Sequence, residues 1–203
     1  MPALAWTTAL VALWFLLSVL IDRRNALREG VSAVSFAEIV AVGVLALAGA
    51  LLAPPSERIA VGLALAGIGI AACGDVRHGY LWEEITVPTL FAVLAASAYA
   101  GIAPNAAAGI VALGGIALAI YFGGQLLGKE PGFGDIVPTA IIGAAVGPVP
   151  GLAALAIACA GFVIAALILG RRFGIALPFG PAIAAAILIG AAAASWLPAI
   201  AGR

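Results

Sequence analysis

Apolar residues dominate the chain in long runs that short polar segments separate. Eight such runs lie near residues 3–21, 36–53, 59–73, 87–103, 107–127, 136–147, 151–169 and 175–196. Several reach the roughly 20 residues that a helix needs to cross the hydrocarbon core of a bilayer. The sixth is short and contains Pro138, which is typical of a partial or cavity-lining helix. The pattern predicts an all-α fold: a polytopic membrane helix bundle with about eight transmembrane segments, in a single domain over residues 1–203.

The composition also indicates a membrane protein. Hydrophobic residues fill 65% of the 203 positions and charged residues only 9%, whereas a soluble domain carries roughly 25% charged residues. The 26 glycines suit the close packing of membrane helices. The formal net charge is zero, so no nucleic-acid partner is indicated. Cys73 and Cys159 lie far apart in apolar segments, and we expect small core residues rather than a disulfide or a zinc site.

The positions of the basic residues predict an orientation in the membrane. Successive connections between membrane spans lie on alternating sides of the membrane. If the N-terminus is outside, the inner side holds seven basic residues and the outer side holds only Arg58 and Arg203. The seven are Arg23, Arg24, Arg28, Arg77, Lys129, Arg171 and Arg172. Because basic residues accumulate in cytoplasmic loops, the connections 22–35, 74–86, 128–135 and 170–174 are expected in the cytoplasm, with both chain ends outside a cell membrane.

Two aspartates fall on this predicted cytoplasmic side. Asp75 is expected to open the connection after the third run, and Asp135 to close the connection before the sixth. If the fold brings them together, the pair shares a proton, because two like charges in a low-dielectric site do not both ionise easily. The ionised carboxylate can act as general base on a water while the protonated one donates to a carbonyl oxygen. This is the chemistry of an aspartic protease, which uses no metal and no cofactor.

Two glycines flank Phe133 immediately before the second aspartate. Because Gly132 and Gly134 lack a Cβ atom, an extended substrate backbone can approach closely there, and both are candidate substrate-binding residues. Taken alone, the tetrapeptide 132–135 also fits a loop that begins a helix, with Asp135 as its N-cap.

Three longer stretches resemble the motifs of the type IV prepilin peptidases. "GDVRHGYLWEEITVPTLFA" (74–92) resembles their first aspartate motif, "GKEPGFGDIVPTAIIGAAVG" (128–147) their Gly-x-Gly-Asp motif, and "LPFGPAIAAAILIG" (177–190) their last helix. The likeness covers most of the chain from about residue 60 onward. It implies a membrane-embedded aspartic endopeptidase with Asp75 and Asp135 as catalytic residues. Its partners would be prepilin or pseudopilin precursors, which lose a short basic leader at the cytoplasmic face.

The sequence departs from the family pattern in three places. The first loop reads "LWEE" at 81–84, where the family commonly has Pro followed by Asp or Asn. Val137 stands where a lysine often follows the second aspartate. The connection 22–35 has no cysteine, whereas full-length members carry a zinc-binding insertion there that accompanies N-methylation of the new pilin terminus. Neither zinc nor methyltransferase activity is therefore expected.

Some residues keep two interpretations. Arg77 either steers the ionisation of Asp75 or meets a lipid phosphate. Glu83 and Glu84 either attract a basic leader or belong to a hydrated loop, and Glu38 is expected at the membrane interface. Two other functions also fit an acidic pair in a membrane bundle: a proton- or cation-coupled transporter or channel, and an inactive family member that acts in pilus or secretion assembly.

Overall fold

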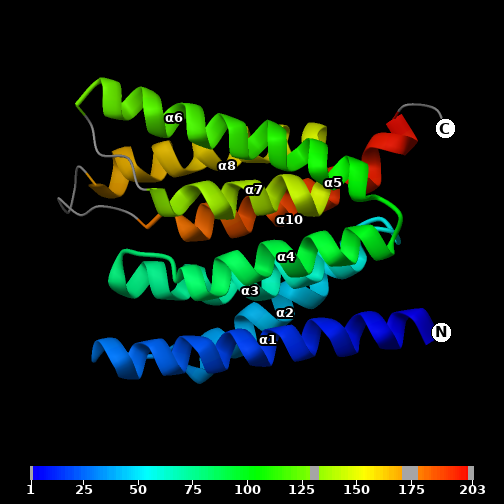
Figure 1. Ribbon diagram of the computed structural model, residues 1–203, viewed down its shortest axis with the longest axis horizontal. Helices are drawn as coiled ribbons and strands as arrows, with labels where there is room; N and C mark the ends of the chain where they lie inside the picture. The colour runs from blue at the N-terminus through cyan, green and yellow to red at the C-terminus, as the bar shows by residue number, and fades with distance from the viewer. Residues whose placement is uncertain (1, 129–132, 171–177, 201–203) are drawn as a thin grey trace.

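The computed structural model describes residues 2–128, 133–170 and 178–200. These residues form helices joined by short connections, and none of them lies in a strand. Figure 1 shows the helices running along one common direction as a bundle. The prediction of an all-α fold is confirmed.

Each apolar run contains one helical stretch. In chain order the helices are α1 (Pro2–Glu29), α2 (Phe36–Leu52), α3 (Arg58–His78), α4 (Glu83–Tyr99), α5 (Ala103–Gly109), α6 (Gly115–Leu126), α7 (Ile136–Val146), α8 (Pro148–Ala165) and α10 (Gly180–Ile200). A π-helical turn, η1 (Ile110–Gly114), joins α5 to α6, and another, η3 (Ala166–Gly170), extends α8. A 3-10 turn, η2 (Phe133–Asp135), leads into α7.

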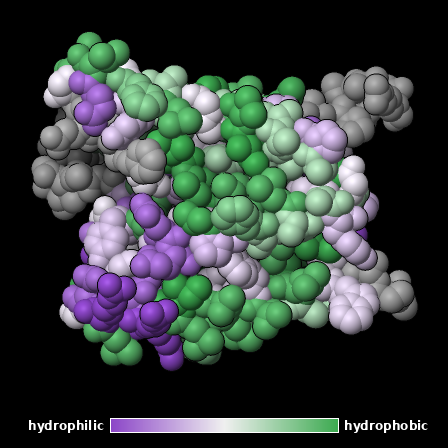
Figure 2. Space-filling model, in the orientation of Figure 1, coloured by the Kyte–Doolittle hydropathy of each residue, from purple (hydrophilic) through white to green (hydrophobic). Residues whose placement is uncertain are grey.

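Length and apolar composition suffice for a membrane crossing in four helices of the described chain. They are Ala5–Glu29, Arg58–His78, Ala103–Leu126 and Pro148–Ile168. The apolar helices Phe36–Leu52, Ile136–Val146 and Gly180–Trp196 are shorter. Apolar side chains cover the middle of the face in Figure 2, and hydrophilic ones gather toward the end where α1 ends. The prediction of a membrane bundle is thus supported for four spans rather than for eight.

Helix α3 is the centre of the bundle. It is buried over most of its length, from Ala60 to Asp75, and α1, α2, α4, α7 and α10 all contact it. Glycines let these neighbours approach closely: a Cβ at Gly67 would overlap the side chain of Thr89, and one at Gly69 would lie 2.5 Å from Val42. Close packing on all sides fixes the position of α3, and with it the position of Asp75 in its last turn.

Two helices are longer than their apolar runs. α1 continues through Arg23, Arg24 and Arg28 to Glu29, so the first connection is only 30–35 rather than 22–35. α3 continues to His78, so Asp75 lies inside a helix and does not open a loop. The physical reason is the same in both cases. Arginine and other straight-chain polar residues favour helix, and basic residues are stabilised at a helix C-terminus.

Candidate active site

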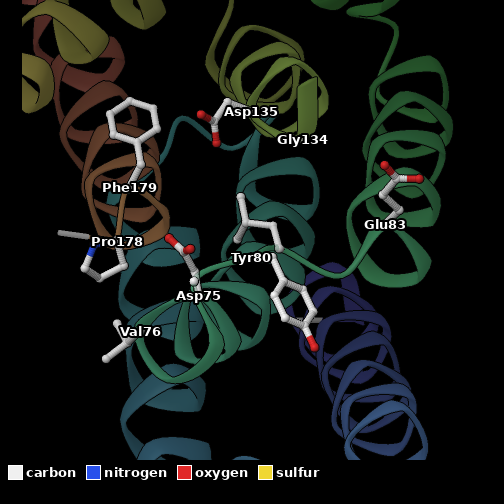
Figure 3. Close-up of a pocket in the computed structure, with 10 residues that line it drawn as sticks. Asp75, Val76, Tyr80, Glu83, Gly134, Asp135, Pro178 and Phe179 are labelled. Atoms are coloured by element: carbon white, nitrogen blue, oxygen red, sulfur yellow. The ribbon is translucent and has the colours of Figure 1, made fainter. Parts of the chain in front are cut away.

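One cavity lies where three segments distant in the sequence meet: the end of α3, the start of α7 and the entry to α10. It encloses about 650 Å³, and its lining includes Asp75, Glu83, Gly134, Asp135 and Phe179. Figure 3 shows the carboxyl groups of Asp75 and Asp135 pointing into the same space from two different helices. The fold therefore brings together the two aspartates that the sequence singles out.

The carboxyl group of Asp75 is held by the first residue of α10. Its side chain is 7% exposed, and Oδ2 accepts a hydrogen bond of 2.6 Å from the backbone N–H of Gly180. The first N–H groups of a helix have no partner within that helix and carry partial positive charge. The contact therefore satisfies one of these groups, orients Asp75 and stabilises negative charge on its carboxylate.

Asp135 is at the N-cap position of α7, but its side chain does not cap the helix. Its backbone is helical, with φ −81° and ψ −13°, and the side chain accepts no hydrogen bond from the first turn. An N-cap side chain reaches those N–H groups from an extended backbone. The interpretation of Asp135 as an ordinary N-cap is therefore wrong. Thr139 donates its hydroxyl to the backbone carbonyl of Asp135 at 2.7 Å, and the carboxyl group of Asp135 faces the cavity.

The two aspartates have different surroundings. Burial raises the pKa of Asp135, and the neighbouring Asp75 carboxylate raises it further. Within the described part of the chain, no donor is hydrogen-bonded to the Asp135 carboxyl, whereas Asp75 has the Gly180 amide. The arrangement therefore gives the Asp75 carboxylate a backbone donor, whereas burial and a neighbouring carboxylate favour the protonated form of Asp135.

The two candidate glycines differ in what the structure says of them. Gly132 lies outside the described residues. Gly134 lines the cavity next to Asp135, and a Cβ added to it would meet no atom within 4 Å. The absence of a side chain at Gly134 therefore keeps the space beside Asp135 open.

Arg77 forms contacts that neither sequence interpretation includes. Its guanidinium pairs with Glu38 and donates to the backbone carbonyl of Ala33. His78 adds a contact of 3.1 Å between Nε2 and the carbonyl of Ser32. These bonds join the end of α3 to the connection between α1 and α2, so Arg77 fixes the helix end that carries Asp75. In the sequence, Ser35 and Glu38 have the spacing of a capping box, and the structure contains that box at the start of α2. This pattern indicates where α2 begins, but it does not indicate that Glu38 also pairs with Arg77.

Gly180 is the site residue that sequence reasoning missed. The stretch 177–190 resembles the last helix of the family, but an amide donor leaves no signature in a side chain. A Cβ at Gly180 would lie 2.9 Å from the Cα of Ala72 and 3.0 Å from Oδ2 of Asp75. Only glycine allows the start of α10 to approach α3 this closely.

Comparisons with known proteins identify no family for this chain. No family model matches it, and no curated protein or solved structure matches it either. In the described part of the chain, no group of three or more His, Cys, Asp or Glu side chains is arranged to hold a metal ion.

We expect Asp135→Asn to be more stable than the wild type at neutral pH. The folded protein raises the pKa of Asp135 above its ordinary value of 3.8, so the unfolded chain loses this proton first as the pH rises. As the pH rises from the ordinary pKa to the raised pKa, the free energy of unfolding of the wild type falls relative to that of the variant. At pH values above the raised pKa the difference between the two free energies stays constant. Thermal unfolding of both proteins in detergent across that range measures it. If the melting temperatures of the two proteins changed in parallel with pH, the raised pKa of Asp135 would be contradicted.

Proposed function

We propose that the protein is a membrane-embedded aspartic endopeptidase of the type IV prepilin peptidase type. It removes the short basic leader of pilin-like or pseudopilin-like precursors at the cytoplasmic face. The observation that carries this proposal is the meeting of Asp75 and Asp135 in one open cavity at the end of a helix bundle. The three motif-like stretches, two of which supply these aspartates, give it its family and substrate class.

The surroundings of the aspartates suggest a role for each. Asp75, with the Gly180 amide on Oδ2, is the carboxylate that removes a proton from a water held between the pair. Asp135, whose pKa burial and the Asp75 charge raise, donates its proton to the carbonyl oxygen of the scissile peptide. The water oxygen adds to the carbonyl carbon to give a gem-diol. Asp75 then gives its proton to the nitrogen of the leaving amine while Asp135 takes one from a gem-diol hydroxyl, and the C–N bond breaks to release the amine and the new carboxyl group.

The size of the cavity supports this chemistry. A peptide bond inside a helix has its amide paired, so a substrate must be unwound before it is cleaved. The space of about 650 Å³ beside the aspartates accommodates an extended segment. Gly134 leaves the approach to Asp135 free of side chains, and we assign Gly132 and Gly134 to contact the substrate backbone.

The proposed orientation places the cavity on the cytoplasmic side. In Figure 1 the end of α1 lies at the same end of the bundle as the starts of α4, α7 and α10, while the N-terminus lies at the other end. Arg23, Arg24 and Arg28 are in the last part of α1, and basic residues favour the cytoplasm. We propose that the shorter apolar helices complete a bundle of about eight spans around the site.

Removal of either aspartate tests the proposal most directly. We expect the purified wild type to remove the leader from a prepilin, and Asp75→Asn and Asp135→Asn each to lower kcat by roughly a thousandfold or more, because the pair acts as one unit. Glu84→Gln, at an exposed position outside the cavity, is the control and should cleave normally. Ion flux into liposomes without any peptide cleavage would instead support a transporter.

Substitution of Gly180 tests the amide contact to Asp75. We expect Gly180→Ala to lower kcat on the order of 100-fold with a smaller effect on KM, because the added Cβ displaces the donor and the carboxylate by a fraction of an ångström. Gly190→Ala is the control on the same helix. Its Cβ would lie 2.8 Å from Val146, away from the cavity, so it should lower stability and leave kcat of the folded protein intact. If Gly180→Ala and Gly190→Ala lowered kcat equally, the proposal that the Gly180 amide positions Asp75 would be rejected.

Two adjacent glutamates offer a test of substrate charge. Both are exposed at the start of α4, but only Glu83 lines the cavity. Figure 3 shows Glu83 across the aspartates from Phe179. No ion pair of Glu83 occurs among the described residues. Its carboxylate is therefore available to a cation, which a basic leader would supply.

We expect Glu83→Gln to weaken the preference for a lysine-containing leader over one with glutamine instead. The ratio of the two kcat/KM values should fall about two- to fivefold, as for an exposed ion pair, and the wild-type ratio should shrink as salt is added. Glu84→Gln should keep the wild-type ratio. If Glu83→Gln and Glu84→Gln weakened the preference for the lysine-containing leader equally, the effect would come from the overall charge of this segment and not from Glu83 in the cavity.

A further inference from the structure

A cavity lies between α1, α2 and α3, at the end of the bundle opposite the aspartates. It encloses about 310 Å³, at the lower end of the roughly 300–1,000 Å³ that ligand sites occupy. Its lining consists of Thr7, Thr8, Val11, Leu47, Ala50, Leu51 and Arg58. Figure 1 shows the N-terminus and the connection from α2 to α3 at this end. Among the described residues, none lines both this cavity and the one that holds the aspartates.

The lining is polar at the end of the bundle and aliphatic further in. Arg58 is the first residue of α3, and the two threonines precede Val11 by about one turn of α1, which places Val11 about 5 Å deeper. Helix α2 ends at Leu52, so Leu47 lies deeper than Leu51. These two leucines are 45% and 62% exposed, so the aliphatic part opens toward the lipid. A polar mouth above an apolar groove fits an amphiphile in the membrane.

Arg58 gives the mouth of this cavity a positive charge. Its Nε atom is buried and has no hydrogen-bond partner, and the guanidinium takes part in no ion pair within the described part of the chain. A buried donor without a partner is costly and uncommon in proteins. A phosphate group supplies what is missing, because a guanidinium binds phosphate oxygens through two parallel hydrogen bonds.

The adjacent carboxyl group of Glu57 does not neutralise this charge. Glu57 is not part of the cavity lining, and the described residues contain no ion pair between it and Arg58. Its Oε2 atom is buried without a hydrogen-bond partner, and burial raises the pKa of Glu57 to about 7. Many molecules therefore carry a neutral Glu57 at neutral pH, and the mouth of the cavity favours an anion.

We propose that this cavity binds one phospholipid, with the phosphate on the Arg58 guanidinium and an acyl chain along Leu47 and Leu51. The inference is independent of the peptidase proposal, because it uses only the membrane bundle and the residues at its other end. The bound lipid contacts α1, α2 and α3 together. Since it binds only where these three helices are packed against one another, it stabilises the folded bundle.

Native mass spectrometry of the protein in detergent, titrated with dioleoyl phosphatidylglycerol, tests the phosphate contact. We expect the wild type to retain one tightly bound lipid. Arg58→Gln should raise its apparent Kd about tenfold or more, as for the loss of a hydrogen bond to a charged group, and Arg58→Lys, which keeps the charge, should raise it less. Arg28→Gln is the control, because Arg28 is exposed in the last turn of α1 at the other end. It should bind the lipid like the wild type.

The acyl-chain contact has its own matched pair of variants. Leu47→Trp should fill the groove and weaken binding, whereas Val44→Trp should not. Val44 is 62% exposed on the same helix and does not line the cavity. Dioleoylglycerol, which has the same chains and no phosphate, should bind to the wild type at least about tenfold more weakly than the phospholipid. Inorganic phosphate alone should not displace the phospholipid.

Three outcomes would overturn the inference. The first is equal affinity of the wild type and Arg58→Gln for the phospholipid, with circular dichroism showing both proteins folded. The second is equal binding of the phospholipid and dioleoylglycerol to the wild type, a comparison that decides the question even if Arg58→Gln does not fold. The third is displacement of the lipid by inorganic phosphate together with unchanged binding in Leu47→Trp, which would make the cavity a site for a soluble anion.

Discussion

A carboxylate buried in an apolar bundle requires a compensating donor, and the arrangement of the site depends on how this requirement is met. Asp75 obtains its donor from the amide of Gly180, which lies 105 residues further along the chain. Without that bond, a nearly buried charge would face apolar surroundings at a high cost in free energy. The bond therefore links the central helix α3 to the entry of α10. The same contact that stabilises the fold also sets the orientation of the proposed catalytic group.

The difference between the two aspartates follows from the elements that carry them. Asp75 is in the last turn of the most buried helix and meets the start of another helix, whose dipole favours negative charge. Asp135 ends a short 3-10 turn and has only a neighbouring carboxylate and a buried environment. Two chemically identical side chains thus have different surroundings: Asp75 accepts a backbone hydrogen bond, whereas burial and a neighbouring carboxylate favour the protonated form of Asp135. This division of roles is what acid–base catalysis by a pair of carboxyl groups needs.

The all-helical fold could be predicted from the sequence because a chain this apolar forms helices wherever its backbone must satisfy its own hydrogen bonds. The ends of α1 and α3 could not be predicted in the same way. Arg23, Arg28 and Arg77 are polar but favour helix, and a hydropathy pattern shows only the apolar part of each helix. Motifs in the sequence indicate Asp75 and Asp135, but the meeting of these two residues depends on contacts between segments that are distant in the chain. Gly180 acts through its backbone amide and Arg77 through a distant partner, Glu38, so no local pattern could reveal either contact.

The corner between α1 and α2 is closed by several bonds at once. Asp22 accepts the backbone N–H of Val34 at 2.8 Å, Arg77 and His78 contact the carbonyls of Ala33 and Ser32, and Arg77 also pairs with Glu38. A six-residue turn (30–35) with this many ties has little freedom to accept extra sequence. Extra sequence inserted at this corner would therefore loosen the end of α3, and with it the support of Asp75, unless new contacts replaced these bonds.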